Sequence, residues 1–403
     1  MSCAKTELCI FDSAAPQVVI DSAVFEEIFP INTVTDGSDV EFSITGSDTE
    51  YLDLNDTLLY VQVKVVGLKD ADLAAAVDVT PCNFFFYSLF DDVTLSLNNQ
   101  KIEGGNRDYP EKAMLETILN YSSDTKNTCL TSIGYDPKAD NRKAWIAKSV
   151  PFSMCGPLQL DFFDQPKYLM PNVNLHLRLK PNNVEYCIKG ADVRLKILAT
   201  KLFVRRVKVD PSVLVGHRIG LTKQNAIYPI RKTRMVSYSL PIGTTNYNKD
   251  QIFGDVRLPK FVLICFKKTD NVNGIATDQS STYEHLSVGS LTLSRNNDFR
   301  ETYTQDFKVD YVTSYVTSII RNMGYLDKDL NIGISLADFK STYPFFTFIL
   351  APDFDIHQTQ LPKQGNLRLE IKFDTALTSA SSIIIYGVFD DEIQINNNGT
   401  III

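Results

Sequence analysis

Residues 93–99 read VTLSLNN and residues 291–297 read LTLSRNN, so five of these seven positions are identical at a separation of 198 residues (291 − 93). In both stretches apolar and polar residues alternate and then give way to two asparagines, which is the pattern of a half-buried β-strand ending in a turn. Strands draw on few residue types, so one short match carries little weight. Its value depends on whether neighbouring segments repeat in the same order.

Five further pairs of segments repeat in that order, at separations between 186 (388 − 202) and 202 (261 − 59) residues. They are Phe42–Ile44 with Tyr238–Leu240, Leu59–Val63 with Phe261–Cys265, Leu115–Tyr121 with Val316–Asn322, Asn174–Lys180 with Asn366–Lys372, and Leu202–Val209 with Val388–Ile395. The fourth pair is preceded in both copies by Asp-Phe, at 161–162 and 353–354. Collinear repeats of similar spacing indicate an internal duplication.

The duplicated unit is predicted to be an all-β domain. Each copy holds roughly eight short alternating runs in about 180 residues, which fits a jelly roll of two packed four-stranded sheets and is also compatible with other β-sandwiches. Helical periodicity is best at 111–121 (EKAMLETILNY) and 312–323 (VTSYVTSIIRNM). We therefore expect two tandem eight-stranded jelly rolls with short helices in loops. The expected boundaries are an N-terminal arm at 1–30, a first jelly roll at 31–210, a second at 211–395 and a tail at 396–403.

Composition narrows the class of protein. A chain of 403 residues suits two domains, and 44% apolar against 22% charged residues is typical of folded proteins. The formal charge of −8 argues against a binder of nucleic acid whose whole surface is basic. Seven scattered cysteines without a C-x-x-C pair favour reduced intracellular thiols. We expect no secretion signal, because Glu7 and Asp12 interrupt the N-terminal apolar residues, and no membrane span.

One acidic stretch invites a metal-binding interpretation. Residues 51–65 read YLDLNDTLLYVQVKV, with Asp53, Asn55 and Asp56 close together. A calcium loop that started at Asp53 would need a glycine at its sixth position and a glutamate at its twelfth, where this chain has Leu58 and Lys64. We therefore interpret the acidic residues as a turn that precedes a strand.

No other pattern indicates catalysis. The four histidines, at 176, 217, 285 and 357, are scattered, and phosphate-loop, nucleophile-elbow and zinc-helix motifs are absent from the sequence. Adjacent carboxylates, as at Asp91-Asp92 and Asp390-Asp391, point to opposite faces of a strand and do not converge on one substrate. We expect no enzyme activity, no cofactor and no metal.

The clearest charge asymmetry surrounds the expected domain boundary. No acidic residue lies between Asp210 and Asp250, while several basic residues lie there or just upstream. The candidate basic patch comprises Arg205, Arg206, Lys208, Arg218, Lys223, Arg231, Lys232 and Arg234. Two interpretations stay open: the segment pairs with acidic surfaces of the other domain or another subunit, or it faces packaged nucleic acid.

Five stretches of the chain resemble the major capsid proteins of Polinton/Maverick elements and the related adintoviruses. They are EFSITGSDTEYLDLNDTLLYVQVKV (41–65), FFFYSLFDDVTLSLNNQKI (84–102), YPEKAMLETILNYSSDTK (109–126), LFVRRVKVDPSVLVGH (202–217) and LPKQGNLRLEIKFDTAL (361–377). The similarity runs in order from about residue 5 to residue 395.

The resemblance implies a double-jelly-roll capsid protein that forms homotrimers of pseudo-hexameric outline. Such trimers would tile an icosahedral shell around double-stranded DNA, with separate penton and minor capsid proteins as partners. It implies residence in the virion capsid, with synthesis in the host cytoplasm and assembly there or in the nucleus. It carries no catalytic residues over to this chain. The N-terminal arm is a candidate for reaching a neighbouring capsomer or an inner-shell protein.

Two other functions stay open at this point. One is a β-sandwich that binds a ligand or glycan through its loops, and the other is a host-domesticated relative of a capsid protein. A stable species of three chains would favour the capsid interpretation, whereas a glycan-binding monomer would favour the first alternative.

Overall fold

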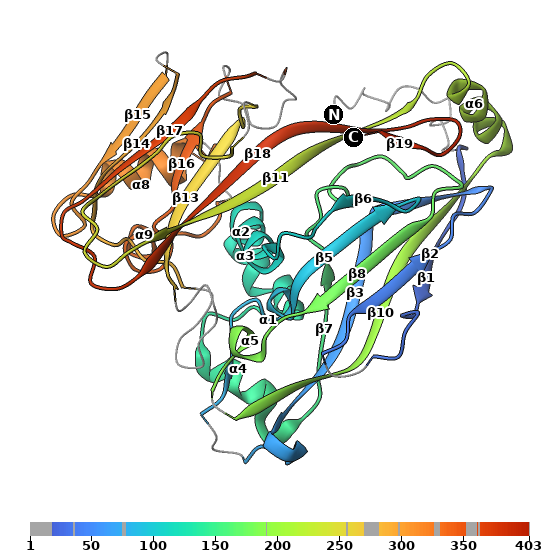
Figure 1. Ribbon diagram of the computed structural model, residues 1–403. Helices are drawn as coiled ribbons and strands as arrows, with labels where there is room; N and C mark the ends of the chain where they lie inside the picture. The colour runs from blue at the N-terminus through green and yellow to red at the C-terminus, as the bar shows by residue number, and fades with distance from the viewer. Residues whose placement is uncertain are drawn as a thin grey trace, which may run out of the picture.

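The computed structural model describes residues 18–34, 37–74, 78–190, 192–254, 257–269, 282–296, 299–325, 331–351, 361 and 363–402. These residues form two β-sandwiches with helices between them (Figure 1). Every ladder between named strands is antiparallel and joins two strands of the same sandwich.

The first sandwich consists of two four-stranded sheets. One has the order β1-β10-β3-β7, with bounds Ile20–Ile28, Val193–Val209, Glu50–Gly67 and Phe152–Pro157. The other has the order β2-β8-β5-β6, with bounds Val40–Ile44, Leu175–Pro181, Phe90–Leu97 and Gln100–Glu103. A separate short ladder joins β4 (Thr80–Pro81) to β9 (Ile188–Lys189).

The second sandwich repeats this arrangement. One sheet has the order β11-β18-β13-β16, with bounds Ala226–Leu240, Ser381–Ile395, Phe261–Lys268 and Phe346–Ile349, and β19 (Ile401–Ile402) pairs with β18. The other has the order β12-β17-β14-β15, with bounds Asn246–Lys249, Leu367–Phe373, Val288–Arg295 and Phe299–Thr304.

The two sandwiches share one strand topology. When the eight main strands of each are numbered from its own first strand, leaving aside the short β4, β9 and β19, the first, eighth, third and sixth form one sheet. The second, seventh, fourth and fifth form the other. This is the order of a jelly roll, and the predicted pair of tandem jelly rolls is confirmed.

In five of the six pairs of similar segments, the two members lie on equivalent elements of the two jelly rolls, and in one pair they do not. Val93–Asn99 matches its partner on β5 and β14, while the others fall on β3 and β13, β8 and β17, β10 and β18, and on helices in equivalent connections. The pairing of Phe42–Ile44 with Tyr238–Leu240 is wrong, because the former lies in a second strand and the latter in a first strand. Three residues are too few to identify a strand by sequence. Asn297 and residues 353–354 lie outside the described residues.

Both jelly rolls place helices between their fifth and sixth strands. The first has α2 (Tyr109–Asn120), α3 (Ser123–Asn127), η2 (Cys129–Ile133), α4 (Ala139–Ile146) and η3 (Ala147–Ser149). The second has α8 (Val312–Tyr315), the π-helix η4 (Val316–Arg321) and α9 (Leu336–Ser341). Other short helices are η1 (Leu68–Asp70), α1 (Phe85–Ser88) and α5 (Val184–Cys187), and α6 (Pro211–Leu221) connects the two jelly rolls.

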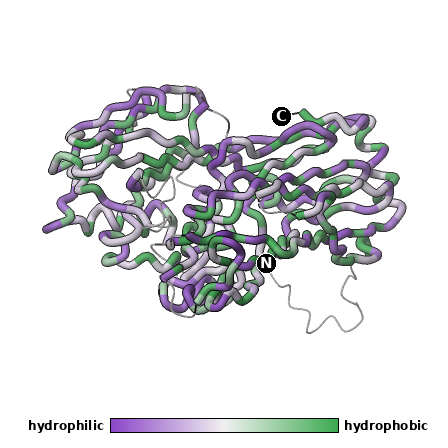
Figure 2. Tube along the Cα trace, turned by 60° about the horizontal axis from the view of Figure 1, so that its bottom comes forward, coloured by the Kyte–Doolittle hydropathy of each residue, from purple (hydrophilic) through white to green (hydrophobic). Residues whose placement is uncertain are grey.

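The alternation read from the sequence accounts for the core. In β8, Leu175, Leu177 and Leu179 are fully buried, whereas His176 and Arg178 face outward. Burying each such leucine contributes about 1.5–3 kcal/mol. Figure 2 shows hydrophilic and hydrophobic residues alternating along strands of both lobes. The predicted strand-core burial of the apolar run at 343–352 is confirmed for β16, whose four residues are all buried.

Three expectations about chain segments need correction. Asp53 and Asp56 do not lie in a turn ahead of a strand, because β3 runs through them. Its pairing with β10 passes from Arg205 opposite Asp53 to Phe203 opposite Leu58, so the residues between them form a bulge. Residues 20–28 of the predicted N-terminal arm form strand β1, which is paired with β10. In the predicted tail, residues 401–402 form a strand on β18.

Candidate interaction surfaces

The two jelly rolls meet along helix α2, where a buried ion pair crosses between them. Lys267, on β13 of the second jelly roll, is fully buried, and its Nζ lies 2.6 Å from Oε2 of Glu111 on α2. The hydroxyl of Tyr283 donates a hydrogen bond of 2.6 Å to Glu111 Oε1, and that of Tyr186 lies 3.4 Å from Oε2. The carboxylate is therefore satisfied from both jelly rolls, as a buried charge requires.

A second polar cluster lies further along α2. Lys112 Nζ lies 2.7 Å from Asp161 Oδ1 and also forms an ion pair with Glu103; Lys112 and Asp161 are almost completely buried, and Glu103 is mostly buried. Glu116 lies one helical turn after Lys112 and adds a third carboxyl. Burial, with the charges of Asp161 and Glu103, raises the pKa of Glu116 to about 8 against the opposing effect of Lys112. Burial alone would lower the pKa of Lys112, but Asp161, Glu103 and Glu116 raise it well above its ordinary value.

Strands of the second jelly roll complete this cluster. The backbone N–H of Thr233 on β11 donates to Asp161 Oδ2 at 2.8 Å, and its hydroxyl lies 2.9 Å from Asp161 Oδ1. The same hydroxyl lies 3.2 Å from Glu116 Oε1, and the hydroxyl of Tyr386 on β18 donates to that oxygen at 3.3 Å. The acidic groups of one jelly roll are thus held by hydrogen-bond donors of the other.

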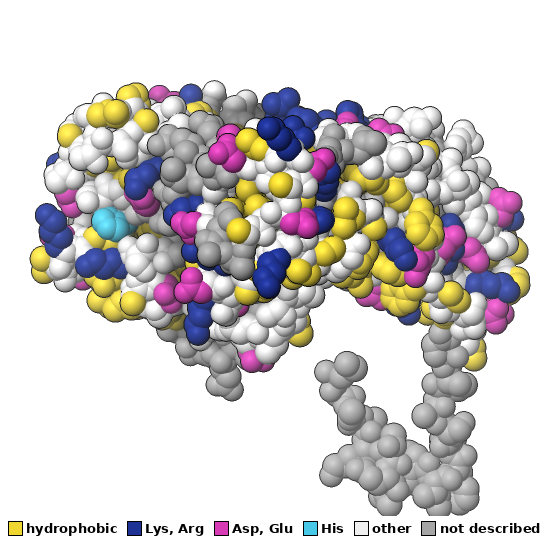
Figure 3. All heavy atoms as spheres, turned by 90° about the horizontal axis from the view of Figure 1, so that it is seen from below, with side chains coloured by type: hydrophobic (Ala, Val, Ile, Leu, Met, Phe, Trp, Pro, Cys, Tyr) yellow, Lys and Arg dark blue, Asp and Glu magenta, His cyan; other side chains and the backbone are white. Residues whose placement is uncertain are grey.

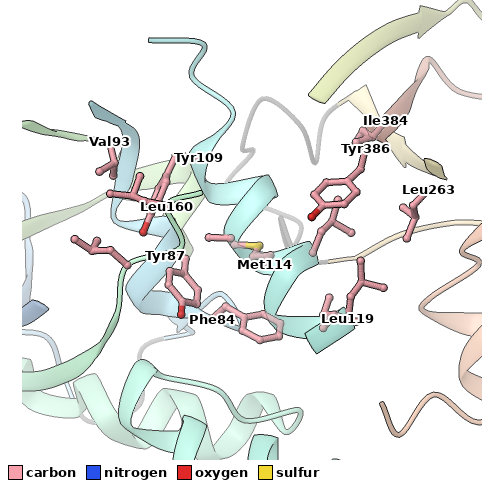
Figure 4. Packing of buried hydrophobic residues seen from close by; sticks show 14 of the residues in the cluster. Phe84, Tyr87, Val93, Tyr109, Met114, Leu119, Leu160, Leu263, Ile384 and Tyr386 are labelled. Atoms are coloured by element: carbon pink, nitrogen blue, oxygen red, sulfur yellow. The ribbon is translucent and has the colours of Figure 1, made fainter. Parts of the chain in front are cut away.

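Apolar side chains surround these polar contacts. Figure 4 shows Met114 and Leu119 of α2 on one side, with Leu263, Ile384 and Tyr386 of the second jelly roll opposite them. All five are buried. Both jelly rolls contribute to one continuous hydrophobic cluster, so the junction resembles the interior of a single domain.

The junction is structural in its chemistry. A cavity of about 170 Å³ is lined by Glu116, Asp161, Thr233 and Tyr386, among others. A carboxyl of raised pKa close to a second carboxyl is also the arrangement of an acid–base pair. Here Lys112 neutralises Asp161, and Thr233 binds both carboxyls, so these groups are committed to contacts within the protein. The arrangement fixes the position of one jelly roll against the other.

The predicted basic patch begins at Arg205 on β10, which lies over the acidic bulge of β3. Its Nη1 lies 3.0 Å from Asp53 Oδ2 and 2.7 Å from Asp56 Oδ2. Burial and the neighbouring Asp56 raise the pKa of Asp53, while Arg205 opposes this. The acidic residues singled out in the sequence are therefore ion-pair partners of an arginine.

The next two basic residues of β10 also face acidic side chains. Arg206 forms an ion pair with Glu26 of β1 and lies 3.7 Å from Glu50 of β3. Lys208 lies 3.2 Å from Asp21. These pairs lie between neighbouring strands of one sheet and are partly exposed, so each contributes little to stability.

The basic residues of β11 lie on the second jelly roll. Lys232 lies 3.2 Å from Asp391 of β18, and the guanidinium of Arg234 lies 5.2 Å from the ring centre of Phe389. Arg231 is exposed. The pairs across this ladder place the acidic run at 390–391 beside the basic run of β11.

Around α6, Arg218 donates to the backbone carbonyl of Asp48 at 3.0 Å, and Lys223 is exposed. The candidate residues are thus divided among β10, the α6 region and β11. On the face drawn in Figure 3, basic and acidic side chains are interspersed.

A broad groove lies beneath α6, with a volume of about 1070 Å³. Tyr51, Met170, Leu214, Ile227 and Tyr228 are among its apolar lining residues. Helix α6 has no buried residue although it is rich in apolar side chains. The hydroxyl of Tyr51 lies 2.6 Å from Nδ1 of His217, which holds the helix against β3.

The described histidines lie in separate places. His176 is on β8 with Glu41 at 3.5 Å, His217 is on α6, and His285 stacks on Phe307 in the second jelly roll. His357 lies outside the described residues. Within the described ranges, no group of three or more His, Cys, Asp or Glu side chains is arranged to hold a metal ion. In these same ranges, every helix is too short or too polar to span a lipid bilayer.

The fold is that of the double-jelly-roll major capsid proteins of viruses. The virus capsid of PBCV-1 matches with a TM-score of 0.62 and 12% identity, covering 98% of this chain and 99% of that chain. The Sputnik virophage structure matches with a TM-score of 0.67 and 10% identity over 98% and 91%. The mavirus major capsid protein matches with a TM-score of 0.55 and 12% identity over 98% and 92%.

Comparison of sequences identifies a distant relative of this chain, but it does not assign the chain to a protein family. An uncharacterized protein of Caenorhabditis elegans is 21% identical over 390 residues, which cover 87% of this chain and 89% of that protein. No protein-family model matches the chain. At these identities the likeness establishes the fold alone.

Sequence reasoning missed the junction residues. Glu111, Lys112 and Glu116 look like ordinary solvent-facing charges on a helix, and Lys267 follows an apolar run as a strand-end lysine would. One signal was available: α2 carries these charges among Tyr109, Met114 and Leu119 without a clear polar face, which is unusual for a surface helix.

Proposed function

We propose that this chain is a viral or virus-derived major capsid protein. The observation that carries the proposal is the pair of jelly rolls with the same strand topology, joined by a buried junction on α2. A binding module can work as a single copy or as two flexibly linked copies, so it does not need two copies locked together in this way. A shell-building protein does, because each chain then supplies two similar blocks in a fixed relative position.

We propose further that three chains close into a capsomer of pseudo-hexameric outline, and that capsomers assemble into an icosahedral shell around double-stranded DNA. Two jelly rolls per chain make six similar blocks in a ring of three. The resemblance at residues 41–65, 84–102 and 109–126 supports a source in the Polinton/Maverick and adintovirus group. Penton and minor capsid proteins as partners, and residence in the virion, are part of the same proposal.

The division of the chain into two domains is also part of this proposal. We place the first jelly roll at about 18–210 and the second at 211–395, with α6 opening the second segment. For the basic patch we favour pairing within the protein over contact with DNA. Arg205, Arg206, Lys208 and Lys232 each face a carboxylate of the same chain, which supports this choice.

The test is the size and shape of the purified full-length chain. Light scattering after gel filtration is expected to give the mass of three chains, and negative-stain electron microscopy to show rings with six lobes. Expression at high level is expected to yield closed particles in the same preparation. A protein that stays monomeric at all concentrations and binds glycans on an array would overturn the proposal.

A further inference from the structure

The groove beneath α6 lies against a hydrophobic cluster that is separate from the main core. Tyr51, Val207 and Val209 form the buried part of this cluster, and Val213 and Leu214 of α6 pack against it while staying partly exposed. Figure 1 shows α6 at a corner of the molecule, in the connection from β10 to β11. The helix therefore covers the cluster without sealing it from water.

Two glycines leave room between α6 and the rest of the protein. Gly216 and Gly220 lie one helical turn apart, and both line the groove. A Cβ atom placed on either residue would have no atom within 4 Å outside the helix's own backbone, and neither residue has a positive φ. Glycine is therefore required here neither by close packing nor by backbone conformation, and its effect is to keep the groove open.

The charged residues that line the groove are all basic. The described lining residues include Lys167 and Arg218 and no aspartate or glutamate, although the whole chain has a formal charge of −8. Lys167 Nζ donates to the carbonyl of Ile227 at 2.7 Å, and Arg218 Nη2 donates to that of Asp48 at 3.0 Å. Neither forms an ion pair with a carboxylate of the described residues. An anionic group in the groove would therefore meet two cations that lack a described carboxylate partner.

The size and the lining of the groove suit an amphiphile. Sites for small molecules are typically about 300–1,000 Å³, mostly apolar, with a few polar groups that orient the ligand. The groove, at about 1070 Å³, lies at the upper end of that range, and its apolar lining includes Met170, Leu214 and Tyr228. A purely apolar ligand would leave the two cations without a partner, and a small anion would leave the apolar walls in water.

We infer that the groove beneath α6 binds one anionic amphiphile per chain, a molecule of the fatty-acid class with an unbranched hydrocarbon chain and one negative head group. The hydrocarbon chain packs along the apolar lining, and the head group accepts charge-assisted hydrogen bonds from Arg218 or Lys167. This inference goes beyond the proposed function, because it assigns a ligand to each chain whether or not chains assemble into a shell.

The test is a titration of the purified full-length chain, freed of co-purified lipid, with sodium decanoate below its micelle-forming concentration. Isothermal titration calorimetry at neutral pH is expected to give one site per chain, and added decanoate is expected to raise the unfolding temperature. Two probes separate the head group from the hydrocarbon chain: 1-decanol lacks the charge, and pentanoate has half the chain length. Each is expected to bind at least about tenfold more weakly than decanoate, because each loses one of the two kinds of contact.

The first variant fills the groove. Gly216→Leu/Gly220→Leu places two apolar side chains in the open volume, and leucine favours a helix more than glycine does, so the variant is expected to fold. Its affinity for decanoate is expected to fall at least about tenfold. The matched control is Val215→Leu/Ile219→Leu on the same helix, since these residues are 53% and 55% exposed and do not line the groove. The control is expected to bind decanoate as the original chain does.

The second variant removes the positive charge. Lys167→Gln/Arg218→Gln is expected to weaken decanoate binding at least about tenfold and to leave 1-decanol binding unchanged, since only decanoate carries a charge. Its control is Lys223→Gln, because Lys223 is an exposed lysine just after α6 that does not line the groove. Far-UV circular dichroism and thermal unfolding check that every variant folds.

Several outcomes would overturn the inference. They are an original chain that does not bind decanoate, a folded groove-filling variant that binds it as well as the original chain, and equal affinities of the original chain for decanoate and 1-decanol. Binding seen only in a chain that lacks residues 1–17 would assign the groove to that segment instead. A groove-filling variant with a smaller mass by light scattering than the original chain would assign the groove to a second copy. Either of these last two results would also overturn the inference.

Discussion

Replacing Lys267 by methionine is expected to destabilise the protein severely. The substitution keeps an unbranched side chain, one atom shorter than lysine, and removes its charge, which leaves Glu111 among the hydroxyls of Tyr283 and Tyr186 without a cation. At the observed 2.6 Å, unit charges attract by roughly 6 kcal/mol at an effective dielectric constant of about 20. Desolvation of both ions offsets much of this attraction, but losing only one partner costs about 3–5 kcal/mol.

A second substitution separates the charge effect from packing. Glu111→Gln in the Lys267→Met background removes the stranded charge and keeps an oxygen that accepts a hydrogen bond from Tyr283. We expect it to restore about half of the lost stability, since replacing both partners of a buried pair is far milder than removing one. The control is Lys143→Met, because Lys143 also lies 2.6 Å from a carboxylate, that of Asp78, but in an exposed pair. That change is expected to leave stability unchanged.

The assay is urea unfolding followed by far-UV circular dichroism at one fixed chain concentration, because association would otherwise shift the midpoint. A loss below about 1 kcal/mol for Lys267→Met would refute the reasoning, since it would mean that the pair is hydrated or that the jelly rolls separate easily. A double variant no more stable than Lys267→Met would also refute it.

Three further outcomes follow from the contacts described above. The pKa of Glu116 is raised to about 8 in the folded protein, so its contribution to stability is complete below about pH 4.5 and is lost as pH rises through 8. The urea concentration at the unfolding midpoint should therefore fall between pH 5 and pH 9, and it should fall less in Glu116→Gln than in the original chain. Arg205→Glu/Arg206→Glu is expected to lower the unfolding temperature, because each glutamate would face carboxylates. It is expected to leave the amount of nucleic acid retained per particle unchanged. Less retained nucleic acid at unchanged stability would favour a patch that faces DNA. Deletion of residues 1–28 removes β1 and is expected to reduce soluble yield and unfolding temperature, whereas deletion of 1–17 spares the strand; equal stability of the two truncations would contradict the pairing of β1 with β10.

Local patterns in the sequence were enough to predict most of the fold. Alternation in segments such as Leu175–Lys180, and its return at Leu367–Lys372, identified strands, their buried faces and the duplication, because side chains of a strand alternate between two faces whatever the rest of the chain does. The same reasoning failed where strand residues were few or atypical. It paired Phe42–Ile44 with the wrong strand, placed β1 in an arm, and took the bulge at Asp53 for a turn.

The sequence by itself determined that the protein consists of two like β-domains, because periodicity and repetition are properties of neighbouring and collinear residues. Only the tertiary structure decided how the domains are joined and which surfaces stay open. Lys267 and Glu111 are 156 residues apart, and Thr233 and Asp161 are 72 apart, so no local pattern relates them. Whether a charge is a solvated surface group or one half of a buried pair depends on what the folded chain brings against it.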